Sequence, residues 1–466
     1  MATAHFVTMK RAEIEDGSWF ERLDHDWSHG KIGLVLLEPE PSGDADLKNA
    51  VETMLESNGS YERGDQAVLH VRPAALALGC ETGTVLRERG IESTLVLGLS
   101  SLGSALDRLV RTAVGTEAIA EADAARLDGI LACYRELLAP IQSKGRGHWI
   151  VPLGTAPDPD PAHVPAINLF SRVAGMGLAP IGDLRSDGRI LSHDIWLDPN
   201  QRDVDRLNED LPAERHWTLE EWRSLVFRSM AVSAAELERL ALDIEGVRLT
   251  IEGSLKGGTL RYQREDGTDF TYRVEGRPVI LDCGKVGNNA LGGTTPQRSA
   301  ITNQPTTEVF VGPLEDSLDG VMVFTVPERT VHGVIRAPYR IEVAGGRVTN
   351  VSAPDEESRR ILRNYTGLEP YDGARLAGDE GAAFALRRTI AEMAIAGFNP
   401  VMQPEIENGR LRPVTGQVLT DEKLGDHQAF GANAQFMGAT PNSYGEHHVE
   451  HTDFVGTIDR TITLEA

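Results

Sequence analysis

Short apolar runs alternate with helical patterns in the first half of the chain, and this alternation restricts the possible folds more than any other feature. The spacing of apolar residues predicts helices over 102–113 and 127–138, and Thr218 and Glu221 have the spacing of a capping box at a helix start. The apolar runs have the length of buried strands and are Gly33–Leu37, Gln66–Val71, Ser93–Leu97 and Trp149–Leu153. We therefore expect an α/β fold with a mostly parallel N-terminal sheet covered by helices.

The second half has a different character, because β-rich segments separated by glycine-containing turns begin at about Val247. The pair Gly345–Gly346 is typical of a hairpin turn, and we expect an amphipathic helix over about Asp379–Ala396. A chain of 466 residues also exceeds the usual size of a single core. The sequence therefore predicts an N-terminal α/β domain over 1–246 and a β-rich α+β catalytic domain over 247–466.

The charge of the chain excludes some classes of partner. Its 70 acidic residues oppose 46 basic ones, which gives a net charge of −24 at pH 7. Such a surface repels phosphate backbones and anionic lipids, so we expect no nucleic-acid and no membrane partner. The start lacks the apolar core of a signal peptide, and three separated cysteines (Cys80, Cys133 and Cys283) suit a reducing compartment. These features predict a cytoplasmic protein. The first half of the chain also contains no glycine-rich nucleotide-binding motif, so no motif indicates a nucleotide role.

Metal-ligating residue types occur in four segments of the second half. Several oxygen or nitrogen donors from different segments must converge to surround an ion. The candidates are Glu308 in NQPTTEVF, Glu392 in RRTIAEMAIAGF, Glu422 and His427 in LTDEKLGDHQAFG, and His451 and Asp453 in VEHTDF. In a strand, residues i and i+2 share a face, so His451 and Asp453 can reach the same ion or neighbouring ions. Each segment taken alone is more typical of solvated polar side chains than of a metal site.

Taken together and in this order, the four segments resemble motifs of the aminopeptidase T family of metallopeptidases, over about Gly258–Phe454. The resemblance implies a metal-dependent aminopeptidase that removes N-terminal residues from peptides. It also implies a homodimer whose active sites face an enclosed cavity. The same resemblance implies that two divalent ions (zinc, cobalt or manganese) are held by Glu308, Glu392, Glu422, His427, His451 and Asp453.

The chemistry of the six donors agrees with this implication. They are too many for one four-coordinate zinc ion, and they suit two ions about 3.5–4 Å apart that share bridging oxygens. Such a pair lowers the pKa of a bridging water and polarises the scissile carbonyl. An acidic site also suits the free α-ammonium group of a peptide.

The chain departs from the family pattern at several positions. Ala434 stands where the family usually has tyrosine, and Lys423 stands where it usually has asparagine. Tyr444 is a possible substitute for the missing tyrosine, and Glu450 is near the ligands in sequence, although solvation is its more ordinary role. The opening segment, up to about residue 60, is extended or diverged relative to the family. The sequence does not identify a general base.

Two other interpretations remain open. The same scaffold resembles 2,5-dihydroxypyridine 5,6-dioxygenase, in which two histidines and an aspartate hold one Fe(II); here these are His427, His451 and Asp453. The substrate is then a small molecule other than a peptide. A relative with a degenerate, non-catalytic site is the third interpretation. Retention of all three glutamates favours the peptidase, because a mononuclear triad does not use them.

Overall fold

The structure is a computed structural model, and it divides the chain into two compact units, Met1–Asp198 and Pro199–Ala466. The boundary predicted at residue 246 lies outside the described residues and stays a prediction. The residues that the structure describes are 6–15, 34–58, 61–72, 75–97, 132–143, 147–153, 190–196, 199–230, 232, 235–236, 257–277, 279–282, 284, 287–288, 298–299, 301–330, 333–369, 387–431 and 451–465.

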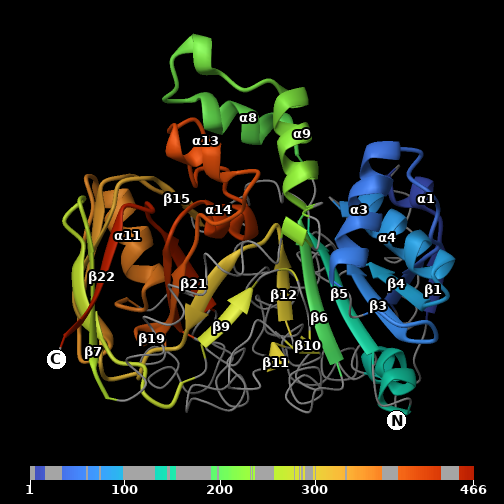
Figure 1. Cartoon of the computed structure of the whole chain (residues 1–466), viewed down its shortest axis with the longest axis horizontal. Helices are drawn as coiled ribbons and strands as arrows, with labels where there is room; N and C mark the ends of the chain where they lie inside the picture. Colours follow the sequence, from blue (N-terminus) through green and yellow to red (C-terminus); the bar gives the residue numbers. More distant parts are fainter. Residues whose placement is uncertain are drawn as a thin grey trace, which may run out of the picture. The chain divides into compact units, whose positions relative to one another are not determined.

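The first unit contains the expected parallel-rich sheet, with strands in the order β1-β2-β4-β3-β5-β6 (Figure 1). All neighbours are parallel except β2 and β4, so the predicted mostly parallel sheet is confirmed. Residues 132–143 are helical, as the pattern over 127–138 predicts, whereas 102–113 lie outside the described residues. The elements are β1 (Phe6–Met9), α1 (Arg11–Glu15), β2 (Leu34–Leu37), α3 (Ala45–Asn58), β3 (Gln66–Val71), α4 (Leu76–Glu88), β4 (Glu92–Leu97), β5 (Gly147–Leu153) and β6 (Ile190–Trp196).

Helix α4 lies close to the sheet because two of its residues are glycines. A Cβ at Gly79 would lie 2.5 Å from Cγ1 of Val71, and a Cβ at Gly83 would lie 2.6 Å from Cδ1 of Leu95. Contacts this short do not occur between real side chains, so an alanine at either position would force Val71, Leu95 or the helix to shift. Two cysteines of this unit, Cys80 and Cys133, are buried.

The second unit begins with helices α8 (Gln201–Asn208) and α9 (Leu219–Met230). The predicted capping box at the start of α9 is confirmed. The amide of Glu221 donates to Oγ1 of Thr218 over 3.2 Å, and the amide of Thr218 donates to Oε2 of Glu221 over 2.9 Å. Among the described residues, no helix is long and apolar enough to cross a bilayer.

Two antiparallel sheets make up most of the second unit (Figure 1). The six-stranded sheet has the order β18-β17-β14-β8-β7-β22, and the five-stranded sheet has the order β21-β20-β19-β13-β9. Their strands are β7 (Thr259–Arg264), β8 (Asp269–Tyr272), β9 (Val279–Asp282), β13 (Glu308–Val311), β14 (Asp319–Phe324), β17 (Tyr339–Ala344), β18 (Arg347–Ser352), β19 (Ile390–Ile395), β20 (His427–Gly431), β21 (His451–Val455) and β22 (Arg460–Glu465). The other elements are β10 (Gly287–Asn288), β11 (Arg298–Ser299), β12 (Ile301–Gln304), β15 (Glu328–Thr330), β16 (Gly333–Ile335), α11 (Glu356–Tyr365), α13 (Gln403–Glu407) and α14 (Val418–Leu424).

The hydrophobic core of the second unit is formed by side chains from one face of the five-stranded sheet and from the six-stranded sheet. Phe454 of β21 lies with its ring centroid 5.8 Å from that of Phe324 and 6.2 Å from that of Tyr339. Met393 of β19 and Phe430 of β20 belong to the same buried cluster. Because side chains alternate along a strand, the residues between these core positions face the opposite side of the sheet.

The helix predicted over Asp379–Ala396 is wrong at its carboxyl end. Residues 370–386 lie outside the described part of the chain, and Ile390–Ile395 form the central strand β19 of the five-stranded sheet. Every residue of this strand is buried, with neighbours on both edges. A strand that is buried on both faces has no alternation of polar and apolar residues, so its pattern does not distinguish it from a buried helix.

The predicted hairpin at Gly345–Gly346 joins β17 to β18 with both glycines at positive φ, 55° and 71°. This turn also supports the start of β19, because the amide of Ile390 donates to the carbonyl of Gly346 over 2.8 Å. The amide of Val348 similarly donates to the carbonyl of Arg388 over 2.8 Å. The hairpin therefore fixes the strand that carries Glu392.

Candidate metal centre

The sheet register places most of the predicted ligands on one face of the five-stranded sheet, opposite the core face. Glu392 and Asp453 are both paired with Ala429 of the strand between them. His427 precedes Ala429 by two residues and His451 precedes Asp453 by two, so all four side chains share that face. Antiparallel pairing thus brings together residues that are far apart in the sequence.

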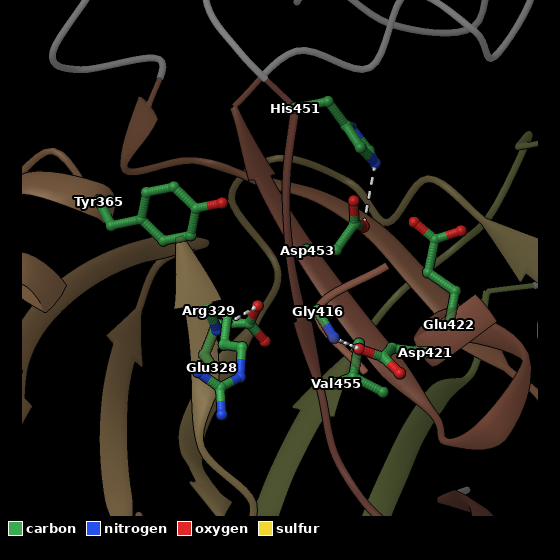
Figure 2. A pocket seen from close by; sticks show the side chains of 9 residues that line it. All are labelled: Glu328, Arg329, Tyr365, Gly416, Asp421, Glu422, His451, Asp453 and Val455. Carbon is green, nitrogen blue, oxygen red and sulfur yellow. Dashed lines mark hydrogen bonds and ion pairs between the residues drawn. The ribbon is translucent and has the colours of Figure 1, made fainter. Parts of the chain in front are cut away.

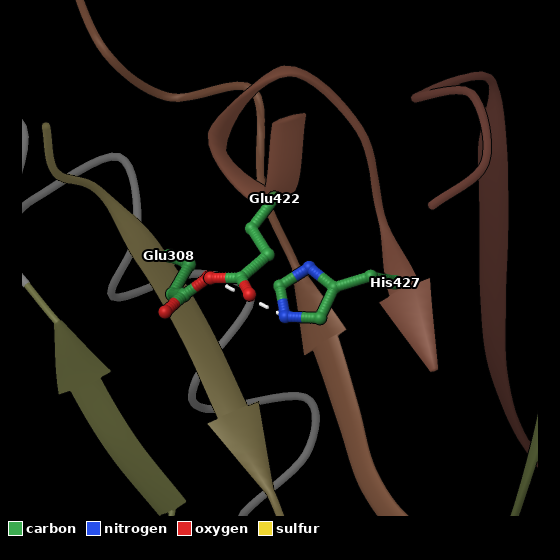
Figure 3. A group of neighbouring side chains, drawn as sticks. All are labelled: Glu308, Glu422 and His427. Atoms are coloured by element: carbon green, nitrogen blue, oxygen red, sulfur yellow. Dashed lines mark ion pairs between the residues drawn. The ribbon is translucent and has the colours of Figure 1, made fainter. Parts of the chain in front are cut away.

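Glu308, Glu422 and His427 form the first ligand group (Figure 3). One ligand atom from each residue lies within 4.8 Å of the others, and Nε2 of His427 lies 3.6 Å from Oε2 of Glu308. All three side chains are buried. Glu308 begins β13, His427 begins β20, and Glu422 comes from helix α14.

The loop before α14 helps to fix Glu422. The carboxylate of Asp421 accepts hydrogen bonds from the amides of Thr415 and Gly416, at 3.1 and 2.8 Å. The hydroxyl of Thr415 donates to the same carboxylate over 2.8 Å. These bonds close the loop onto the first turn of the helix and so hold the neighbouring Glu422 over the sheet.

Glu392, His451 and Asp453 form the second ligand group. Nε2 of His451 lies 3.0 Å from Oε2 of Glu392 and 3.3 Å from Oδ1 of Asp453; Figure 2 shows the latter contact. The two groups adjoin, because Nε2 of His427 lies 3.7 Å from Oε1 of Glu392. The predicted sharing of one face by His451 and Asp453 agrees with this geometry.

Two further charged residues lie at the first group, and neither was identified as a site residue from the sequence. The buried ammonium of Lys423 lies 2.5 Å from Oε1 of Glu308 and 3.6 Å from Oε2 of Glu422. It also lies 3.7 Å from Oδ2 of Asp282, the last residue of β9, which is paired with Glu308 across the sheet. Two features of the sequence could have indicated these residues: the carboxylate at the end of the apolar run VILD, and the lysine next to Glu422.

The histidines carry raised pKa values. Burial acts to lower the pKa of His427, but its hydrogen bond to Glu392 and the nearby carboxylates of Glu308 and Glu422 raise it to about 10. The pKa of His451 is likewise raised well above its usual value, because Asp453 and Glu392 outweigh burial. In the opposite sense, the two imidazoles hold the pKa of Glu392 well below its usual range despite burial.

The carboxylates of the first group carry pKa values raised by burial, although Lys423 opposes the effect for both Glu308 and Glu422. With no other cation, protons therefore compensate part of the buried negative charge. Protons and divalent cations compete for the same atoms in such a cluster, so cations displace these protons on binding.

The donor set fits divalent ions by its net charge and because it contains a buried carboxylate oxygen that accepts no hydrogen bond within the described part of the chain. Four ligand carboxylates and Asp282 carry five negative charges when ionised, and Lys423 offsets one of them. The remaining four negative charges match two divalent cations. In addition, Oε2 of Glu308 is buried without a hydrogen-bond partner among the described residues. Buried carboxylate oxygens in this state are typical of metal ligands.

A cavity of about 230 Å³ lies beside the second ligand group (Figure 2). Glu422, His451 and Asp453 form one wall, so a molecule in the cavity reaches the ligand groups directly. The other lining residues are Glu328, Arg329, Tyr365, Gly416, Asp421 and Val455. Most of the charged side chains in this lining are carboxylates, which favours a cationic group in the ligand.

All six predicted ligands therefore lie in two adjoining groups within the described part of the chain. Ala434, at which the chain departs from the family pattern, lies outside the described residues. Tyr444, Glu450 and Cys283 lie outside them as well.

The fold and these groups define a mixed α/β protein with a buried carboxylate–imidazole centre suited to divalent cations. No family model matches the chain. Aminopeptidase AmpS of Bacillus subtilis (strain 168) is 26% identical over 178 residues, which are 38% of this chain and 35% of that protein. The aligned region thus spans about a third of that relative.

A solved structure extends the comparison to most of the chain. Wild-type AmpT from Thermus thermophilus has a TM-score of 0.60 and 16% sequence identity, and the similarity covers 90% of this chain and 94% of that one. The chain therefore has the aminopeptidase T fold. The resemblance to the aminopeptidase T family that the motifs indicate is confirmed.

Proposed function

We propose that the protein is a metal-dependent aminopeptidase that holds two divalent ions and removes N-terminal residues from peptides. The observation that carries this proposal is the convergence of all six candidate ligands into two adjoining groups beside one cavity. The similarity to two aminopeptidases supports the type of reaction. Zinc, cobalt and manganese all suit such a donor set.

The residues of the chain have distinct tasks in this proposal. Glu308, Glu422 and His427 hold one ion, and Glu392, His451 and Asp453 hold the other. Divalent ions in such a site supply a water of lowered pKa and polarise the scissile carbonyl. The protein contributes the fixed spacing of the two groups, because five of the six ligands are on strands of one sheet.

The cavity suits the amino end of a peptide. Glu328 and Asp421 also line it, and although burial raises the pKa of both carboxyls, a bound α-ammonium group would favour their ionised forms. Its volume of about 230 Å³ admits a small part of a substrate, such as the first residue of a peptide, and not a folded protein.

The mononuclear dioxygenase is the weaker alternative. That reaction needs His427, His451 and Asp453 around one Fe(II). Among the described residues, however, His427 groups with Glu308 and Glu422, whereas His451 and Asp453 group with Glu392. Three buried glutamates have no task in a mononuclear triad. The retention of every candidate ligand, four of which are buried, also disfavours a degenerate relative.

One experiment separates the three interpretations. Protein purified without oxygen is assayed for metal content, for cleavage of aminoacyl-arylamides and for oxygen-dependent turnover of 2,5-dihydroxypyridine. About two zinc, cobalt or manganese ions per chain together with arylamide cleavage are expected. One iron with ring opening supports the dioxygenase, and neither metal nor turnover supports the degenerate relative.

We also propose that the protein acts as a homodimer, as the resemblance to the aminopeptidase T family implies, and that it works in the cytoplasm, which its separated cysteines favour. Light scattering of the purified chain tests the assembly, and a mass of twice that of one chain is expected. A monomer that retains full arylamide cleavage contradicts this part of the proposal.

A further inference from the structure

Lys423 makes the environments of the two ligand groups different. Its ammonium contacts the first group, 2.5 Å from Glu308 and 3.6 Å from Glu422, and its side chain is fully buried. Among the described residues, the ion pairs of Lys423 connect it to these two carboxylates and to Asp282. In the second group, Glu392 and Asp453 are paired with His451 instead.

The ammonium affects metal binding in two ways. It forms an ion pair with Oε1 of Glu308, so that Oε2 remains as the oxygen that can bind an ion. Oε2 has no hydrogen-bond partner among the described residues. The ammonium also places a positive charge within a few ångströms of any ion held by this group, and the two repel each other. Each group contains one imidazole, His427 or His451, that can bind a metal as a neutral ligand, whereas the ammonium beside the first group is not a ligand at all.

Asp282 limits this effect and keeps the first group usable. Its carboxylate is held by the amide of Asn303, over 3.0 Å, and by the hydroxyl of Thr302, over 2.5 Å. Held in this way, it lies 3.7 Å from the ammonium of Lys423 and offsets its charge. The first group can therefore hold a cation, but in competition with the lysine.

We propose that Lys423 makes the two ion positions unequal. The Glu392–His451–Asp453 group binds a divalent ion first and tightly, and the Glu308–Glu422–His427 group binds a second ion more weakly. This inference rests on the proposed two-ion function and deepens it, since it names the residue that sets the order of filling. Lys423 is fully buried, so it acts on the ions through Glu308 and not by contact with a substrate.

Binding of Co²⁺ to the full chain tests the inference without an activity assay. Metal-free protein is titrated by equilibrium dialysis, and visible absorption reports the coordination of each ion. The wild-type chain should bind two ions with dissociation constants at least about tenfold apart. Glu308→Gln should remove the weaker step, and Glu392→Gln should disrupt the tighter one.

Two variants with opposite expected effects decide the role of the lysine. Lys423→Asn should tighten the weaker step at least about tenfold, because the competing charge is gone. Asp282→Asn should weaken that same step, because the lysine charge is no longer offset. Lys48→Asn is the matched control: this lysine is 40% exposed, pairs with Glu88 at 3.1 Å, and should leave both steps unchanged.

Equal affinities in the wild-type chain, or an unchanged weaker step in Lys423→Asn, overturn the inference. If Lys423→Asn does not fold, as judged by circular dichroism, Asp282→Asn decides: an unchanged or tighter second step overturns the inference. A wild-type chain that binds no Co²⁺ contradicts the proposed function itself. The two failures are therefore distinguishable.

Discussion

At the scale of single residues, Glu392 has the most connected position in the candidate centre. One of its oxygens lies 3.0 Å from His451 and the other lies 3.7 Å from His427, so it adjoins both ligand groups. It is also buried in the central strand of its sheet. No other candidate ligand among the described residues has ion pairs to both histidines.

Glu392→Gln should lower arylamide cleavage by at least about 100-fold, because the amide keeps the shape of the side chain but removes the shared negative charge. Steady-state kinetics at saturating metal measure the loss, and circular dichroism checks the fold. Glu357→Gln, an exposed glutamate of α11, is the control and should retain full turnover. Near-normal turnover of Glu392→Gln would exclude it from the centre.

The candidate ligands were predictable from the sequence, but their charged neighbours were not. His451 and Asp453 could be placed on one face from their spacing alone, since strand periodicity is local. The contact of Lys423 with Glu308 depends on how α14 lies over the sheet, which no local pattern encodes. The same is true of Asp282, whose partner in the sheet is chosen by strand order.

At the scale of elements, the hairpin between β17 and β18 positions the strand that carries Glu392. Its two glycines differ in surroundings: a Cβ at Gly346 would lie 1.7 Å from the carbonyl oxygen of Glu315, whereas a Cβ at Gly345 would meet nothing within 4 Å. Both have positive φ, so both substitutions carry a similar backbone cost.

Gly346→Ala should therefore destabilise the protein much more than Gly345→Ala. We expect about 1 kcal/mol for Gly345→Ala, from backbone strain, and about 3 kcal/mol or more for Gly346→Ala, from the added clash. Urea unfolding of the two variants measures the difference in the free energy of unfolding. Equal losses would show that the turn relaxes freely, and that it does not fix β19.

Helix α8 contains a buried carboxylate whose titration affects stability. Burial raises the pKa of Asp203 to about 7, with a smaller contribution from Asp421 and against the hydrogen bond from Nε1 of Trp222. The folded state therefore keeps a proton that the unfolded state loses at about pH 4. Stability from this group is greatest below that pH and falls as the pH rises towards 7.

Asp203→Asn should remove this pH dependence. The variant should gain on the order of 2 kcal/mol relative to wild type between pH 5 and pH 8, because its side chain stays neutral throughout. Urea unfolding at both pH values measures the change. Asp205→Asn, on the exposed side of the same helix, should show no such gain. A pH-independent difference for Asp203→Asn contradicts the assignment.

Periodicity alone does not distinguish a strand from a helix where both faces are buried, so flanking turn signals decide the prediction. The run Gln66–Val71 was recognised as a buried strand because turn signals bound it closely. The run Ile390–Ile395 has no turn signal on its amino side, where a helical pattern precedes it, so the pattern predicts a helix there. The order of the strands in either sheet follows from long-range packing and was not predictable.

At the scale of the whole molecule, the buried excess of negative charge links ion binding to stability. Without divalent ions, the folded state confines carboxylates that repel one another, and the unfolded chain does not. Ions that bind only the folded state add stability according to their free concentration.

Chelation should therefore lower the midpoint of thermal unfolding by roughly 5–10 °C, and re-addition of the metal should restore it. Scanning calorimetry before and after dialysis against a chelator measures the shift. Glu392→Gln should respond less than wild type, since one ligand group is impaired. An unchanged midpoint in wild type would mean that the folded state gains nothing from the ions.

The spread of the ligands along the chain has a consequence for biosynthesis. During translation, β13, β19, α14 and β20 leave the ribosome before β21 does. A nascent polypeptide that has emerged as far as Gly431 presents Glu308, Glu422 and His427, but it lacks His451 and Asp453. The tight position in our proposal is thus complete only after β21 has emerged, later than the weaker one, so tight metal binding requires the finished sheet.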